Sequence, residues 1–171
     1  MDGKILIHPT EGIWGIGCDA FSAKAVKKIK NLKQRDSTKS FILLVSSTSN
    51  ALAYCKPLNQ LKLATLQEIW PGHTTAILES SKIIPDNIKS IDNTIALRVS
   101  AHKPLFDLLK FFNKPMVSTS ANISNQPTPK SLAEVSTIFK DPDVAIYNHK
   151  NGIAKKPSSI INLNTMEYLR E

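Results

Sequence analysis

The chain has 171 residues and a formal net charge of +8, from 22 lysines and arginines against 14 aspartates and glutamates. Its 42% hydrophobic and 21% charged residues are typical of a globular protein and exclude a disordered or fibrous chain. The length predicts a single domain, residues 1–171, and the positive charge favours an anionic partner such as a nucleotide, RNA or an anionic surface.

The first predicted strand is Lys4–His8, which ends at Pro9. The next segment, Thr10–Asp19, contains three glycines and is expected to be a loop. A helix follows Ser22, a typical N-cap residue, because apolar residues recur at three- and four-residue spacing as far as residue 32.

The later elements are predicted from periodicity, capping residues and breaks at proline or glycine. Expected strands are Phe41–Val45, Thr74–Leu78, Thr94–Val99, one that opens at Pro115, Val144–Tyr147 and Ser159–Leu163. Expected helices are Leu61–Trp70, Leu105–Phe112 and Ser131–Phe139. Because strands alternate with helices, we predict an α/β fold with a twisted, mixed and largely parallel open sheet flanked by helices. The polar run Tyr147–Pro157 is either a mobile flap or a long connection.

Polar residues follow a buried strand in the segment Lys114–Asn125, which reads KPMVSTSANISN. Ser118, Ser120 and Asn122 hydrogen-bond nearby backbone readily, so they belong at a strand end or in a tight loop. Ligands of open α/β sheets bind beyond the carboxyl ends of strands, where this cluster would lie. A helix cap or a polar turn explains the same residue types, and the cluster alone does not decide between them.

Lys33 and Arg35 are a second candidate for ligand binding. On a continuous helix, residues i and i+2 point about 200° apart, so the two cations can converge only if the helix ends here. An arginine fork beside a lysine point charge suits the oxygens of a triphosphate. The alternative is structural, because the helix dipole favours cations at any helix C-terminus.

Arg98 lies in a predicted strand whose alternation places Thr94 and Arg98 on one face. It can clamp a carboxylate or phosphate, or pair with a neighbouring aspartate, and the spacing leaves both open. The pattern Gly15–Ala20 fits GxGxxA, but six residues separate it from the preceding strand, which argues against a dinucleotide site.

No pattern of metal ligands is present in the sequence. Cys18 and Cys55 have no neighbouring ligand at a metal spacing, and His73 has no spaced partner histidine, so we expect no metal site held by the protein. The longest apolar run, Phe41–Val45, is too short to cross a bilayer, so we expect a cytoplasmic protein without membrane contact.

Taken together, these motifs resemble the YrdC/TsaC family, the threonylcarbamoyl-AMP synthases that begin N6-threonylcarbamoyladenosine modification at position 37 of ANN-decoding tRNAs. The resemblance covers nearly the whole chain. The matching segments are Pro9–Glu11, Trp14–Ala20, Lys33–Arg35, Trp70–Gly72, Leu97–Val99, Ser118–Asn122 and Pro157–Ile160.

The resemblance implies a sheet with a basic concave face on which L-threonine, bicarbonate and ATP with Mg²⁺ react to give threonylcarbamoyl-AMP and pyrophosphate. The family's KxR and SxN motifs fall on four residues: Lys33, Arg35, Ser120 and Asn122. By the same resemblance, Thr10 and Arg98 contact the amino acid, and Thr94 and Ser118 line the cleft. The family's pathway also implies tRNA at the basic face and the transferase proteins TsaD, TsaB and TsaE as partners.

Two other functions remain open from the sequence. The basic face could bind double-stranded RNA, tRNA or a ribosome precursor without chemistry, because phosphate contacts alone give such binding. Similar domains also occur inside carbamoyltransferase maturation enzymes, but the zinc-finger and acylphosphatase-like segments of those enzymes are missing from this sequence.

Overall fold

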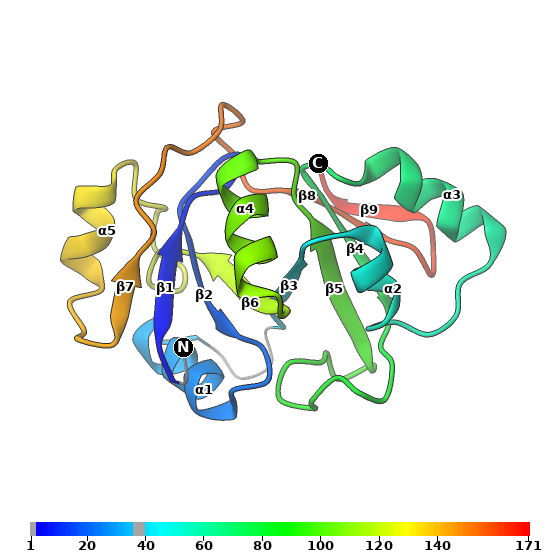
Figure 1. Cartoon of the computed structure of the whole chain (residues 1–171), viewed down its shortest axis with the longest axis horizontal. Helices are drawn as coiled ribbons and strands as arrows, with labels where there is room; N and C mark the ends of the chain where they lie inside the picture. Colours follow the sequence, from blue (N-terminus) through cyan, green and yellow to red (C-terminus); the bar gives the residue numbers. More distant parts are fainter. Residues whose placement is uncertain (1–2, 36–39) are drawn as a thin grey trace.

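A computed structural model describes residues 3–35 and 40–171, which form one nine-stranded sheet with helices on both faces (Figure 1). The strands are β1 (Ile5–His8), β2 (Gly15–Asp19), β3 (Ile42–Val45), β4 (Thr74–Glu79), β5 (Thr94–Val99), β6 (Met116–Ser120), β7 (Val144–Ile146), β8 (Ser159–Asn162) and β9 (Glu167–Arg170). The helices are α1 (Ala23–Leu32), α2 (Thr48–Leu52), α3 (Gln60–Ile69), α4 (Lys103–Phe112) and α5 (Leu132–Ile138).

The strand order is β7-β1-β2-β6-β3-β5-β4-β8-β9, so the sheet is mixed, as the sequence predicts. Within the described ranges, five neighbouring pairs are antiparallel and three are parallel. The prediction of a largely parallel sheet is therefore wrong. Three of the antiparallel pairs, β1–β2, β4–β5 and β8–β9, arise because their strands are joined without an intervening helix, so the chain returns beside the strand it has just left.

Three elements differ from the sequence prediction. Gly15–Asp19 is the strand β2 rather than part of a loop, with Ile16 and Cys18 fully buried on its core side. The two others are α2, which begins after the N-cap Ser47, and β9, whose four residues are all exposed. Neither has an apolar periodicity that a sequence reading could detect.

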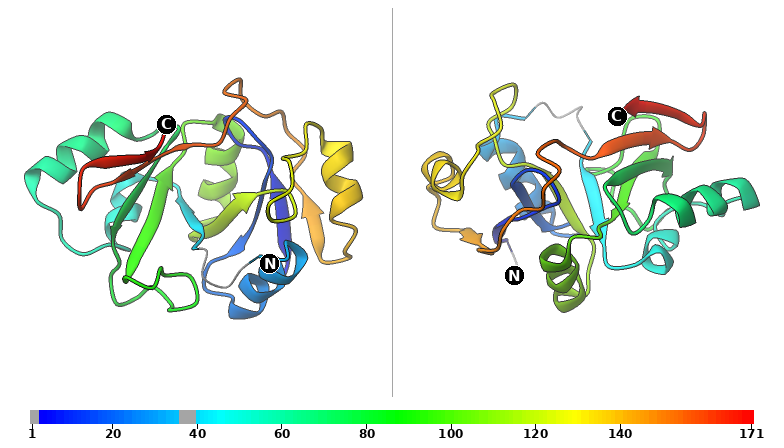
Figure 2. Two further views of the ribbon diagram at one scale, coloured as in Figure 1. Left: turned by 180° about the vertical axis from the view of Figure 1, so that it is seen from behind. Right: turned by 90° about the horizontal axis from the view of Figure 1, so that it is seen from above.

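Two apolar clusters cover opposite faces of the sheet. The larger one includes Val26 of α1, Leu66 of α3 and Val135 of α5. The smaller one joins Leu105, Leu108 and Leu109 of α4 to Leu6, Leu44 and Met116 of the sheet. The view from above in Figure 2 shows α4 and α1 on opposite sides of the sheet.

The α4 face of the sheet is only partly covered. Met116 lies under α4, and Ser118, two residues further along β6, points to the same face of the sheet because side chains alternate along a strand. The register places Ser118 beside Gly17 of β2 and Ile42 of β3, and Ile42 still packs against the α4 cluster, so the covered region ends at about this point. The uncovered part of the face carries the cavity described next. Among the described residues, no helix is long and apolar enough to cross a membrane.

Candidate functional site

A cavity of about 310 Å³ lies on the uncovered part of the sheet. Its floor is formed by residues of β2, β3, β4, β5 and β6, and its walls by the segments around residues 10–14 and 157–160. Three arginines line it, Arg35, Arg98 and Arg170, and no aspartate or glutamate is among the described residues that do so. The cavity is therefore suited to an anionic ligand.

Lys33 lies beneath the cavity rather than on its surface. Its side chain is buried, and Nζ donates to the backbone oxygens of Ser120 and Asn122, the latter at 2.5 Å, and to Asn122 Oδ1 at 3.4 Å. Burial, with a smaller contribution from the charge of Arg35, lowers the pKa of Lys33 to about 7. The three donors of the ammonium group are used in holding the loop after β6.

Arg35 reaches the cavity because α1 ends at Leu32 and Gln34 has a left-handed φ of 50°. The predicted end of the helix at this point is confirmed. Arg35 Nη2 donates to Ser40 O at 2.6 Å and Nη1 to Thr119 Oγ1 at 3.3 Å, and the guanidinium lies 5.0 Å from the centre of the Phe41 ring. Burial lowers the pKa of Arg35, and a guanidinium remains charged at neutral pH.

The loop after β6 is fixed by its own polar groups. Ser120 Oγ donates to Asn122 Oδ1 at 2.6 Å, and Asn122 Nδ2 donates to Gln126 O at 2.5 Å. Ser120 lines the cavity, and Asn122 is buried behind it. Asn125 adopts φ 65°, a left-handed conformation that asparagine tolerates better than most residues.

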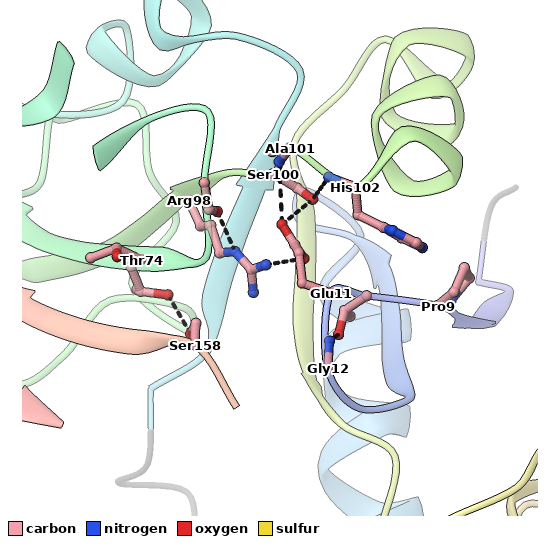
Figure 3. Close-up of polar contacts among 12 residues, drawn as sticks. Pro9, Glu11, Gly12, Thr74, Arg98, Ser100, Ala101, His102 and Ser158 are labelled. Carbon is pink, nitrogen blue, oxygen red and sulfur yellow. Dashed lines mark hydrogen bonds and ion pairs between the residues drawn. The ribbon is translucent and has the colours of Figure 1, made fainter. Parts of the chain in front are cut away.

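Arg98 forms a buried ion pair with Glu11, as Figure 3 shows. Nη2 donates to Glu11 Oε2, and Nε donates to Gly72 O at 3.2 Å. The other carboxyl oxygen accepts from Ser100 Oγ at 2.8 Å and from Ala101 N at 3.2 Å. Burial alone would raise the pKa of Glu11, but Arg98 and Ser100 outweigh it and lower that pKa. The sequence left a carboxylate partner open, and the structure supplies a glutamate rather than an aspartate.

Thr10 and Ser118 line the cavity, but Thr94 is not among the residues that do so. Thr10 Oγ1 donates to Ile13 O at 2.6 Å and accepts from the backbone nitrogens of Gly12 and Ile13, so it fixes a turn. Thr94 stands at the far end of β5 and donates to Asp92 Oδ1 at 2.8 Å.

The polar run Tyr147–Pro157 is tied along the loop that follows β1. Asn151 Oδ1 accepts from Thr10 N at 3.0 Å, and the backbone nitrogens of Gly152 and Ala154 donate to the oxygens of Thr10 and Glu11 at 2.8 and 2.9 Å. The run therefore serves as a connection that is built into the wall of the cavity. This observation favours the second of the two alternatives that the sequence left open.

Arg170 is a cavity residue that the sequence analysis missed. It extends from β9, and its Nε and Nη2 donate to Ser158 O at 2.7 Å and to Ser158 Oγ at 3.3 Å. Ser158 Oγ is also 2.9 Å from Thr75 Oγ1. Burial and the charge of Arg98 lower the pKa of Arg170. The motif at Pro157–Ile160 pointed to this wall, but the exposed sequence of β9 contains no signal for an arginine that reaches the cavity.

Comparisons with known proteins find similarity over the whole chain. A family model described as Sua5_yciO_yrdC, telomere recombination, matches residues 1–171. The chain belongs to the Sua5/YciO/YrdC family. It is 37% identical over 174 residues to the threonylcarbamoyl-AMP synthase of Pseudoalteromonas atlantica, covering 100% of this chain and 92% of that protein.

Two solved structures of Sua5/YciO/YrdC proteins share the fold. P. abyssi Sua5 complexed with L-threonine has a TM-score of 0.86 and 28% identity, and the match covers 95% of this chain and 48% of the Sua5 chain. E. coli YciO has a TM-score of 0.87 at 24% identity, covering 99% of this chain and 83% of that one, and supports the fold alone.

The predicted site residues of this Sua5/YciO/YrdC protein thus fall into three groups. Those that line the cavity are Thr10, Arg35, Arg98, Ser118 and Ser120. Lys33 and Asn122 support the cavity from below, and Thr94 lies apart from it. Within residues 3–35 and 40–171, no group of three or more His, Cys, Asp or Glu side chains could hold a metal ion.

Proposed function

We propose that this chain is a threonylcarbamoyl-AMP synthase, which converts L-threonine, bicarbonate and ATP into threonylcarbamoyl-AMP and pyrophosphate. The observation that carries the proposal is the cavity lined by Arg35, Arg98 and Arg170, with no aspartate or glutamate among the described residues that line it. Such a cavity suits the triphosphate of ATP and the carboxylate of an amino acid. The full-length match to a synthase of that name supports the same reaction.

The chemistry needs three reactants in one place. The amine of threonine, as the free base, forms a carbamate either by attacking the carbon of CO₂ and losing a proton, or by attacking the carbon of bicarbonate with loss of water. A carbamate oxygen then attacks the α-phosphorus of ATP, and the bond from that phosphorus to the bridging oxygen breaks to release pyrophosphate. Holding the reactants together supplies much of the acceleration in reactions of this kind.

The arginines stabilise the negative charge. Arg35 and Arg170 neutralise the phosphates and the leaving pyrophosphate, as electrostatic catalysis of phosphoryl transfer requires. Arg98 holds the threonine carboxylate through Nη1, which has no hydrogen-bond partner among the described residues. Ser120 and Thr10 orient the reactants from the cavity walls.

Lys33 and Asn122 act through the loop rather than on the phosphates. Lys33 Nζ donates to oxygens of this loop and does not line the cavity, so its contribution is to fix the position of Ser120. We propose that Mg²⁺ enters as the Mg-ATP substrate, because the described residues provide no cluster of ligands for a metal ion.

Further proposals follow from the pathway rather than from the site. The product carries an activated carbamoyl group, so a transferase must consume it at tRNA, and TsaD, TsaB and TsaE are the partners we propose for that step. The net charge of +8 supports an encounter with tRNA, and we place the reaction in the cytoplasm.

Pyrophosphate release from Mg-ATP by the purified protein tests the proposal. We expect release that requires both L-threonine and bicarbonate, falls when L-serine replaces threonine and persists in Lys103→Gln, a change at an exposed lysine of α4. A folded protein that binds RNA but releases no pyrophosphate under any combination would instead be a non-catalytic RNA-binding module.

A further inference from the structure

His8 is a buried polar residue that the proposed reaction does not use. It is the last residue of β1, is 0% exposed, and lies opposite Gly15 in the antiparallel pairing with β2. A histidine inside a protein must satisfy both ring nitrogens or lose the free energy of hydration. Its partners are therefore informative.

The strand β2 has a glycine where the imidazole lies. A Cβ at Gly15 would stand 2.4 Å from Cε1 and 2.6 Å from Nε2 of His8, so only glycine permits this close approach. The GxG pattern that resembled a dinucleotide motif thus has another explanation. Gly15 leaves room for the ring of His8 beside the floor of the cavity.

The two ring nitrogens have distinct roles. Nδ1 lies 3.1 Å from Pro9 O, and a carbonyl only accepts, so Nδ1 carries the hydrogen. Burial lowers the pKa of His8 to about 4, so the ring is neutral at pH 7 and Nε2 is an acceptor. Nε2 lies 3.1 Å from Ser118 Oγ, and the serine hydroxyl therefore donates to it.

The consequence falls on Ser118, which lines the cavity. Because its single hydrogen is directed to His8, the hydroxyl can offer only lone pairs to a ligand. We propose that His8 is a positioning residue that fixes Ser118 as an acceptor for an N–H or O–H donor of the amino-acid substrate. This inference rests on the proposed function, and a donor of that kind is present in threonine as its amine and its hydroxyl.

The test compares two replacements of His8 by equilibrium binding of L-threonine and of ATP. His8→Phe keeps an aromatic ring but removes the acceptor, and we expect the Kd for L-threonine to rise roughly three- to tenfold, the effect of one net hydrogen bond. The Kd for ATP should stay within about twofold. His8→Gln can place an amide oxygen near Ser118, and we expect it to restore most of the threonine affinity.

A double-mutant cycle separates positioning from packing. Ser118→Ala should weaken threonine binding, and His8→Phe in that background should add no further loss, because the two residues act through one hydrogen bond. Additive losses, an equal weakening of ATP binding, or His8→Phe with unchanged threonine affinity would each overturn the inference. If His8→Phe does not melt cooperatively, His8→Leu replaces it.

The ligand donor is identified with L-2-aminobutyrate, which has the amine and carboxylate of threonine but no hydroxyl. If His8→Phe loses affinity for threonine but not for L-2-aminobutyrate, the donor to Ser118 is the threonine hydroxyl. If it loses affinity equally for both ligands, the donor is the amine. A wild-type protein that binds no threonine would contradict the proposed function. A wild-type protein that binds threonine, with His8→Phe binding equally well, would contradict only the role of His8.

Discussion

Replacing Lys33 by methionine separates a lysine that supports a loop from one that binds phosphate. The change keeps a side chain of similar length and removes the ammonium group. Nζ donates to Ser120 O, to Asn122 O at 2.5 Å and to Asn122 Oδ1 at 3.4 Å, so three buried acceptors lose a donor. Ser120 O also accepts from Asn122 N, and Asn122 Oδ1 also accepts from Ser120 Oγ, so Asn122 O is the acceptor left without another donor among the described residues. We expect Lys33→Met to be less stable than the wild type by about 1–3 kcal/mol, the cost of one unsatisfied buried acceptor.

The lowered pKa of Lys33 determines how the stability of the wild type changes with pH. Burial, with a smaller repulsion from Arg35, lowers the pKa of Lys33 from 10.5 to about 7. Between these values the unfolded chain binds more protons than the folded one, so the free energy of unfolding rises with pH. The two pKa values give a rise of about 2 kcal/mol between pH 7 and pH 9, present in the wild type and absent from Lys33→Met.

Urea unfolding at pH 7, 8 and 9 measures this difference, with the fluorescence of the buried Trp14 and Trp70 as the signal. Subtracting the free energy of unfolding of Lys33→Met from that of the wild type at each pH cancels the titration of every other group. Lys103→Met is the matched control, because the Lys103 side chain is 82% exposed, and we expect a small effect at every pH.

A difference between wild type and Lys33→Met that stays constant or shrinks as the pH rises would refute the reasoning. The ammonium group would then remain charged in the folded protein across this range, held by the loop carbonyls. Loss of pyrophosphate release with no loss of stability would refute the supporting role itself and place Nζ against the phosphates.

Three further predictions concern the cavity and its walls. Arg35→Gln should lower kcat for pyrophosphate release by about 100-fold at saturating substrates, and an unchanged kcat would exclude Arg35 from charge stabilisation. Glu11→Gln should lower the free energy of unfolding by about 3 kcal/mol, since it leaves the buried Arg98 unpaired. Because the pKa of Glu11 is lowered from 4.5, this loss should be full at pH 7 and shrink as acid titrates the wild-type carboxyl, and a loss independent of pH would contradict the ion pair. Gly12→Ala should lower the melting temperature, because the new Cβ would come within 2.0 Å of Lys156 O. An unchanged melting temperature would show that the backbone around Lys156 can shift without loss of stability.

The sequence predicts much of the fold because most elements have a local signal. The helix α1 has a capping serine and an apolar stripe, and the strand β3 is a continuous apolar run. The segment Gly15–Asp19 was misread because its glycines conceal the alternation of Ile16 and Cys18. Gly15 leaves room for the ring of His8, and a Cβ at Gly17 would stand 2.4 Å from Val117 O. Both neighbours lie on adjacent strands, so no local pattern could identify these glycines.

The part of the site that has a local signal in the sequence was predicted, and the part that depends on distant segments was not. The end of α1 could be inferred from local chemistry, so the arrival of Arg35 at the cavity was foreseeable. The different roles of Lys33, which holds the loop after β6, and Arg35, which lines the cavity, could not be predicted, because they depend on where that loop lies in space. Arg170 was missed because all four residues of β9 are exposed, and a strand without a buried face leaves no alternation in the sequence.

The most direct test of the proposed function is the identity of the product formed from ¹³C-bicarbonate, L-threonine and Mg-ATP. We predict a species, detected by mass spectrometry, that joins threonine, one labelled carbon and AMP, formed together with one pyrophosphate. Formation of ADP and phosphate, or of AMP without the labelled adduct, would contradict attack of a threonine carbamate on the α-phosphorus.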